Sequence, residues 1–150
     1  MEGMDWKIKP FNELTIDELY AILHLRSEVF VLEQHCVYQD MDYSDQKALH
    51  LMGVADSGRL LAYTRIFAPG IKFKEASIGR VVTSPLARGQ GTGRELMERS
   101  IEALQRHFGK IPIRIGAQQY LQRFYTSLGF EQASDTYLED GIAHIEMLKL

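Results

Sequence analysis

The residues best suited to carry chemistry lie in a short glycine-rich segment, residues 88–94. Three glycines at alternate positions let backbone N–H groups approach a ligand closely, because no Cβ obstructs them. A helical pattern begins within the segment, and the first turn of a helix adds unpaired N–H donors and about half a positive charge. The segment therefore predicts a site for a phosphate-bearing ligand, built from Arg88, Gly89, Gln90, Gly91, Thr92, Gly93 and Arg94.

Two common phosphate motifs do not fit this segment. The dinucleotide fingerprint, Gly-x-Gly-x-x-Gly/Ala, needs a glycine or alanine at its last position. That position is Arg94 if the motif starts at Gly89, and Leu96 if it starts at Gly91. A P-loop ends in lysine followed by serine or threonine, and the segment has no lysine. The remaining pattern is Arg88-x-x-Gly91-x-Gly93, and its alternative is a glycine-rich connection that binds nothing.

The elements that must position this segment follow from hydrophobic periodicity and turn signals. The spacing of Thr15 and Glu18 predicts a capping box at the start of the first helix. The expected helices are 15–33, 91–108 and 120–128, and the expected strands are 6–11, 48–54, 60–67, 77–83, 111–117, 131–138 and 142–150. The order βαβββαβαββ predicts an α/β (α+β mixed) single domain over residues 1–150. It should contain one mixed, mostly antiparallel sheet with helices on both faces.

The pattern Arg88-x-x-Gly91-x-Gly93 resembles the Arg/Gln-x-x-Gly-x-Gly/Ala loop of the GNAT superfamily of N-acetyltransferases, which binds the pyrophosphate of coenzyme A. The order of elements is also that of the superfamily and covers nearly the whole chain. Residues 124–130, Phe-Tyr-Thr-Ser-Leu-Gly-Phe, are similar to the superfamily's helix that ends in an aromatic–tyrosine pair, three spacer residues and Gly-Phe. The resemblance implies a GNAT-like fold and acetyl-CoA as the co-substrate.

The resemblance also implies roles for residues outside the loop. The backbone around Val82 and Thr83 would pair with the pantetheine arm and polarise the thioester carbonyl. Tyr125 would give a proton to the leaving thiolate, and its alternative is a core aromatic on a helical apolar stripe. Gln118 stands where many members have an asparagine that holds the pantetheine, and it could form the same amide hydrogen bonds from one methylene further away.

Two further segments resemble a narrower group. Residues 26–42 and residues 140–147 are similar to the ElaA-like branch, with Ala143 where proline is expected. The resemblance to this branch does not supply the amine acceptor.

Deprotonation of the acceptor amine needs a general base, and such bases contribute about 10²–10⁴ in rate. The candidates are Glu33 at the end of the first helix, His50 in a strand and His144 just past the last hairpin turn. Each has a structural alternative, such as a hydrogen-bonded strand histidine. The sequence does not choose among them.

Two arginines are candidates for the acceptor pocket. Strand alternation places Arg80 on the same face as Val82, and Arg65 in the preceding strand could lie beside it. Two guanidinium groups there would favour an acceptor that bears a carboxylate or a phosphate. The alternative is cross-strand pairing with an acidic neighbour such as Glu75.

Composition narrows the class of protein. The 150 residues are 45% hydrophobic and 25% charged, with a net charge of −3, which argues against a nucleic-acid binder. No apolar run approaches the roughly 20 residues of a membrane span, and no signal peptide is visible. Cys36 is the only cysteine, so it cannot form an internal disulfide, and no metal-site spacing is present. We expect a cytoplasmic monomer or homodimer without metal, nucleic-acid or membrane partners.

These observations predict an acetyl-CoA-dependent N-acetyltransferase that acts on a primary amine of a small molecule or a protein. Two alternatives stay open. One is a coenzyme A-binding regulatory or interaction module without turnover, and the other is an acyltransferase that uses a longer acyl-CoA. The length of the acyl group depends on how the two central strands separate, which the sequence does not determine.

Overall fold

The strands form two antiparallel sheets. The computed structural model describes residues 3–150. The first sheet has the order β1-β2-β3-β4, and in the second β8 pairs with β5, β6 and β7. Their bounds are β1 Met4–Pro10, β2 Leu49–Ala55, β3 Leu60–Phe67, β4 Ser77–Thr83, β5 Ile113–Gln118, β6 Glu131–Gln132, β7 Tyr137–Glu139 and β8 Ile142–Lys149.

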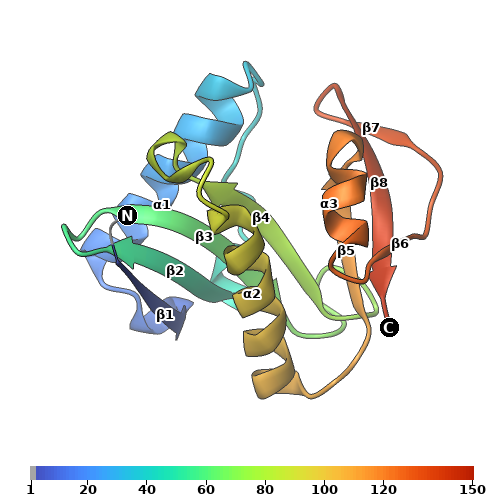
Figure 1. Cartoon of the computed structure of the whole chain (residues 1–150), viewed down its shortest axis with the longest axis horizontal. Coiled ribbons are helices and arrows are strands. Elements are labelled where there is room, and N and C mark those ends of the chain that lie inside the picture. Colours follow the sequence, from blue (N-terminus) through green and yellow to red (C-terminus); the bar gives the residue numbers. More distant parts are fainter. Residues whose placement is uncertain (1–2) are drawn as a thin grey trace.

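The two sheets join at one point. Ala76 and Ile113 form an isolated parallel bridge, and the backbone N–H of Arg114 donates to the carbonyl of Ala76 at 2.9 Å. Beyond this bridge β4 and β5 run apart, as Figure 1 shows. The expected mixed α+β class with mostly antiparallel strands is confirmed, but the expectation of one continuous sheet is wrong. Strands that separate after one bridge leave space between their edges.

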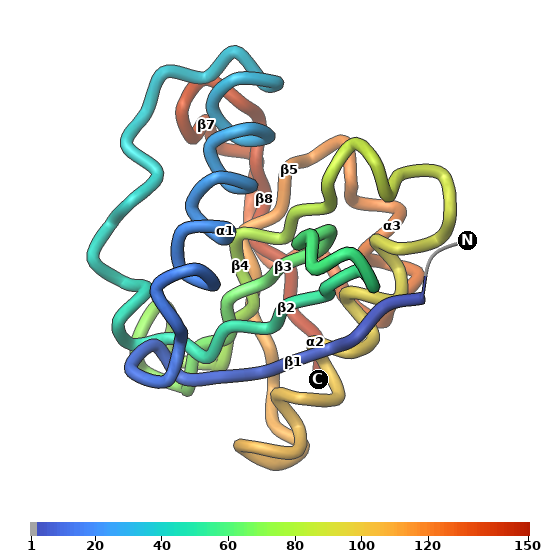
Figure 2. Tube along the Cα trace, turned by 90° about the vertical axis from the view of Figure 1, so that its left-hand side faces the viewer, coloured from blue at the N-terminus to red at the C-terminus, as the bar shows by residue number. Residues whose placement is uncertain are grey.

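Helices cover both faces of the first sheet, as predicted (Figures 1 and 2). The apolar residues of α1 (Ile16–Arg26) pack on the face that carries Tyr63 and Val82. On the opposite face the Thr64 hydroxyl lies 2.8 Å from the Ser100 hydroxyl of α2 (Thr92–Phe108). The third helix, α3 (Gln122–Thr126), contributes to the core that α2 shares with the second sheet.

The first helix begins at the predicted cap. The N–H of Glu18 donates to the Thr15 hydroxyl at 3.0 Å, and the Thr15 N–H donates to the Glu18 carboxylate at 2.9 Å. After α1 the chain continues as a π-helical segment, η2 (Ser27–Glu33). The expected helix over 15–33 is therefore confirmed, but its last part is wound as a π-helix and not as an α-helix. Such π segments are rare and are often found at functional sites.

The remaining elements are short. The expected strand 131–138 is divided into β6 and β7, and between them the Ser134 hydroxyl accepts the N–H of Glu146 at 2.8 Å. Single turns of 3₁₀-helix are η1 Phe11–Glu13, η3 Asp45–Lys47, η4 Pro85–Ala87 and η5 Gln119–Leu121. Within residues 3–150, no helix is both long enough and apolar enough to cross a membrane.

Candidate active site

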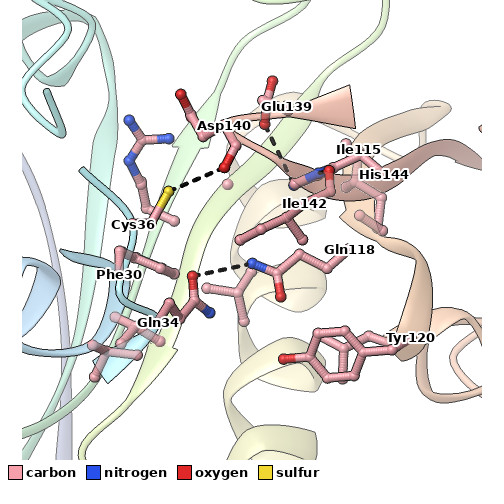
Figure 3. A pocket seen from close by; sticks show the side chains of 18 of the residues that line it. Phe30, Gln34, Cys36, Ile115, Gln118, Tyr120, Glu139, Asp140, Ile142 and His144 are labelled. Atoms are coloured by element: carbon pink, nitrogen blue, oxygen red, sulfur yellow. Dashed lines mark hydrogen bonds and ion pairs between the residues drawn. The ribbon is translucent and has the colours of Figure 1, made fainter. Parts of the chain in front are cut away.

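A cavity of about 530 Å³ occupies the space between the separating strands. Its walls come from the end of η2, Cys36 and Tyr38, strands β4 and β5, the glycine loop with the start of α2, the segment from η5 to α3, and the β7–β8 hairpin. Figure 3 shows side chains from η2, β5, η5 and the β7–β8 hairpin around the cavity. The single bridge between β4 and β5 is therefore the feature that creates the site.

The glycine loop lies at one end of this cavity. Gly89 and Gly91 have φ values of +79° and +75°, a conformation that side chains rarely adopt. A Cβ at Gly89, Gly91 or Gly93 would meet no atom within 4 Å, so the loop faces open space. Gly91 is also the N-cap of α2, a helix of 17 residues whose first N–H groups have no partner inside the helix. The loop thus has the open, donor-rich geometry that a diphosphate requires.

The predicted loop residues separate into two groups. Arg88 and Gly93 line the cavity, whereas Gln90 and Thr92 line a second hollow of about 320 Å³. Arg94 points toward the start of the loop after α3, where its Nη1 donates to the Ser127 hydroxyl at 2.9 Å. The structure therefore brings residues near both ends of the loop to the cavity, whereas the side chains of Gln90 and Thr92 face the second hollow.

Strands β4 and β5 supply the polar groups at the centre of the cavity. Val82 and Thr83 both line it, and Gln118 reaches across it from the end of β5. The Nε2 of Gln118 donates to Oε1 of Gln34 at 3.4 Å, a contact that Figure 3 shows spanning the cavity. Gln34 has no signal in the sequence, because nothing local indicates that the end of η2 lies opposite β5.

Tyr125 lies at the wall of the cavity with its ring in the core. Its exposed fraction is 5%, and the ring makes edge-on contacts with Phe124 and Phe130. Among the described residues its hydroxyl has no hydrogen-bond partner. Burial, with a smaller effect of Tyr120, raises the pKa of this hydroxyl, which therefore keeps its proton at neutral pH. The geometry is compatible with both interpretations of Tyr125: the ring packs in the core, and the protonated hydroxyl lies at the cavity wall.

His144 is the histidine that the structure places in the cavity. Its Nδ1 lies 2.8 Å from the Ile142 carbonyl, which can only accept, so Nδ1 carries the hydrogen. The other nitrogen, Nε2, is then free to take a proton in the neutral ring. The Glu139 carboxylate lies 3.4 Å from Nε2.

His50 lies outside the cavity lining, which removes it from the candidate bases. It is fully buried, its Nε2 lies 2.8 Å from the Asp45 carbonyl, and its Nδ1 lies 2.6 Å from the Tyr63 hydroxyl. Burial lowers the pKa of His50 and keeps the ring neutral. Both nitrogens are engaged in holding β2 to its neighbours, so the interpretation of a hydrogen-bonded strand histidine is the correct one.

The two predicted pocket arginines have different positions. Arg80 lines the cavity, but Arg65 lies deeper and outside its lining. The expected strand alternation is also interrupted, because Tyr63 pairs with Val82 while Arg65 pairs with Gly79. Arg80 is part of the resulting bulge and has a φ of +49°. The prediction that both arginines face the acceptor is wrong for Arg65.

Both arginines belong to a buried ionic network that the sequence did not reveal. Residues 37–47, here called the aspartate loop, provide the carboxylates. Arg65 makes two contacts with Asp42, at 2.8 and 2.6 Å, and a third with Asp45 at 2.9 Å. The Nε of Arg80 donates to Asp40 at 2.8 Å, and the fully buried Arg26 contacts Asp40 and Asp45 at 2.8 and 2.7 Å.

Arg–Asp pairing is thus the dominant role of these arginines, although Glu75 is not their partner. Glu75 pairs instead with Arg114, at 3.1 Å. The aspartate loop closes one wall of the cavity, where Tyr38 stands with Cys36 just before it. The thiol of Cys36 donates to the carbonyl of Asp140 at 3.3 Å, which ties this wall to the β7–β8 hairpin (Figure 3).

The ionic network predicts how stability changes with pH. Burial alone would raise the pKa of Asp42 and Asp45, but their contacts with Arg65 and Arg26 outweigh burial and hold both pKa values below the usual 3.8. A carboxyl whose pKa is lower in the folded state stabilises the fold fully above its unfolded value and loses that contribution as the pH falls. We therefore expect the melting temperature to fall as the pH drops below about 4.

The measurement is a series of melting curves between pH 7 and pH 3 for the wild type and Asp42→Asn. The variant should melt lower at pH 7 and show a shallower decline in acid, because it has no charge to lose at this position. Parallel curves for the two proteins would contradict the assignment.

In the part of the chain that the structure describes, no group of three or more histidine, cysteine, aspartate or glutamate side chains is placed to hold a metal ion.

Comparison with known protein families gives a match over most of the chain. The family model of the acetyltransferase (GNAT) domain matches residues 13–150. Protein ElaA of Escherichia coli is 39% identical over 148 residues, which cover 97% of this chain and 96% of that protein. A UPF0039 protein of Schizosaccharomyces pombe is 41% identical over 148 residues, with 98% and 97% covered.

Solved structures have the same fold. An acyl-CoA N-acyltransferase from Pseudomonas aeruginosa aligns with a TM-score of 0.94 and 45% identity, covering 99% of this chain and all of that chain. The crystal structure of Escherichia coli ElaA aligns with a TM-score of 0.92 and 38% identity over 99% of this chain and 100% of that one. A coenzyme A-dependent acyl-homoserine lactone synthase, BjaI, has a TM-score of 0.79 at 15% identity, covering 97% and 82%, and shares the fold alone.

Proposed function

The chain belongs to the GNAT family of acetyltransferases, and on that premise we propose that it is an acetyl-CoA-dependent N-acetyltransferase. It transfers an acetyl group to a primary amine of a small molecule or protein, by direct attack of the amine in a ternary complex in the cytoplasm. The observation that carries the proposal is the meeting of three features at one cavity. These are the open glycine loop, the separated edges of β4 and β5, and the hydroxyl of Tyr125.

The residues at the cavity fit coenzyme A. The open space in front of Gly89, Gly91 and Gly93 admits a diphosphate close to the backbone, and Arg88 adds a positive charge. Beyond the bridge at Ala76, β4 has no neighbouring strand on its cavity side within residues 3–150. The backbone near Val82 and Thr83 can therefore bind the pantetheine arm and polarise a carbonyl, with Gln118 as a further amide. Acetyl-CoA, when bound, supplies an acetyl group activated as a thioester.

The protein's own groups can move the two protons that acetyl transfer requires. Nε2 of His144 is the site that can accept a proton from the amine, and the Glu139 carboxylate lies 3.4 Å from it. Tyr125 holds a proton at the cavity wall and can donate it to the leaving thiolate. Glu33, the other remaining candidate base, is already engaged with Arg88.

The test is release of free thiol from acetyl-CoA across a panel of small primary amines and lysine-containing peptides, with products identified by mass spectrometry. Calorimetry with coenzyme A is run in parallel. We expect binding and amine-dependent thiol release. Binding without release from any acyl-CoA would indicate the regulatory module, release only from longer acyl-CoA donors would change the donor, and absence of binding would reject the proposal.

A further inference from the structure

Glu33 and Arg88 form an ion pair at the exposed side of the cavity, between the end of η2 and the glycine loop. The two Nη atoms of Arg88 donate to the two carboxylate oxygens of Glu33, each at 2.6 Å. Nη2 also lies 3.4 Å from the carbonyl of Thr83. Both side chains line the cavity, and their exposed fractions are 43% for Arg88 and 40% for Glu33.

We propose that Glu33 is a latch on Arg88 that coenzyme A must displace, so that the carboxylate and the diphosphate compete for the same guanidinium. This inference rests on the proposed function, because it takes the glycine loop as the diphosphate site. Glu33 is therefore assigned to the control of co-substrate binding rather than to deprotonation of the amine.

The geometry explains the competition. A guanidinium binds a phosphate best through two parallel N–H groups, and Glu33 already occupies the pair on the two Nη atoms. A diphosphate that approaches a neutral ion pair gains less attraction than one that approaches a free guanidinium, and it also meets the negative charge of Glu33. The hydrogen bonds from Arg88 lower the pKa of Glu33, so this carboxylate is charged at neutral pH.

The opposite role would be a strut, in which Glu33 holds Arg88 in the position that the diphosphate needs. The two roles predict changes of opposite sign when the charge of Glu33 is removed. A latch makes coenzyme A bind more tightly in Glu33→Gln, whereas a strut makes it bind more weakly. The substitution keeps the size of the side chain, and the exposed position leaves no buried charge behind.

The experiment is calorimetric measurement of the Kd for coenzyme A, at one fixed ionic strength, in five forms of the chain: wild type, Glu33→Gln, Arg88→Gln, the double variant, and Glu102→Gln as control. Glu102 forms an exposed pair with Arg106 further along α2 and does not line the cavity, so its substitution removes the same charge elsewhere. This control measures how much the Kd changes when one negative charge is removed far from the glycine loop. That change should be small, because dissolved salt screens the interaction between distant exposed charges.

We expect Glu33→Gln to lower the Kd roughly two- to fivefold relative to Glu102→Gln, the range of an exposed ion pair. Arg88→Gln should weaken binding more in the Glu33→Gln background than in the wild type, because only there is the guanidinium fully available. An unchanged or higher Kd in Glu33→Gln, or equal effects of Arg88→Gln in both backgrounds, would overturn the latch while leaving the proposed function intact. Absence of binding in the wild type would instead reject the proposed function.

Discussion

Gly93→Asp is expected to abolish binding of coenzyme A while leaving the fold intact. Gly93 is the second residue of α2 and lines the cavity, and a Cβ there would meet no atom within 4 Å. Its φ is not positive, so a side chain brings no backbone strain. A carboxylate in the first turn also suits the helix, since the N-terminal end of a helix favours negative charge. The new charge would occupy the place that we assign to the diphosphate.

The expected effect is a rise in Kd of at least about 100-fold, equivalent to about 2.7 kcal/mol, with little change in melting temperature. Calorimetry measures the Kd, and a melting curve checks the fold. The matched control is Gly93→Asn, which has almost the same size and no charge, and which should bind coenzyme A far better than the aspartate variant. Wild-type affinity in a folded Gly93→Asp protein would show that the diphosphate binds elsewhere.

Tyr125→Phe is expected to lower kcat by about 10²–10⁴ with little change in KM for acetyl-CoA. The hydroxyl would act only as the thiolate departs, whereas the ring packs equally well before and during the reaction. Phenylalanine keeps the contacts with Phe124 and Phe130. The hydroxyl has no partner among residues 3–150, so no hydrogen bond within the described chain is lost and stability should hardly change.

The measurement is steady-state kinetics with an amine that the thiol-release assay has identified, together with a melting curve. Tyr120→Phe is the matched control, because Tyr120 also lines the cavity but is largely exposed (Figure 3). Removal of this second hydroxyl should leave kcat within a few fold of the wild type. If Tyr125→Phe keeps kcat within twofold while chemistry limits the rate, Tyr125 serves packing alone.

Local patterns in the sequence determined most of the elements that build the site. The capping box at Thr15 and Glu18 requires only residues three positions apart, and the structure confirms it. The glycine loop depends on the backbone of a few neighbouring residues, and the positive φ values of Gly89 and Gly91 agree with that prediction. Such features are predictable because their energy comes from contacts within one or two turns of the chain.

Strand alternation predicted which residues share a face only as far as the strand stays regular. One extra residue at the Arg80 bulge shifts the register of β4 against β3, and nothing in the alternation of side chains marks it. The division of the sheet after the bridge between Ala76 and Ile113 was equally unpredictable, because it depends on the pairing of segments from different parts of the chain.

Only the tertiary structure decided which charged groups are free for chemistry. By sequence Arg65 is a candidate for the acceptor pocket, but Asp42, which lies 23 residues earlier, holds it in a buried network. By sequence His50 is a candidate base, but in the structure it is buried and both ring nitrogens contact other groups, the Tyr63 hydroxyl and the Asp45 carbonyl. Arg88 carries the phosphate motif, yet its partner Glu33 lies 55 residues away. The sequence specifies which residue types are present, but charge pairing across such separations depends on the path of the chain in space.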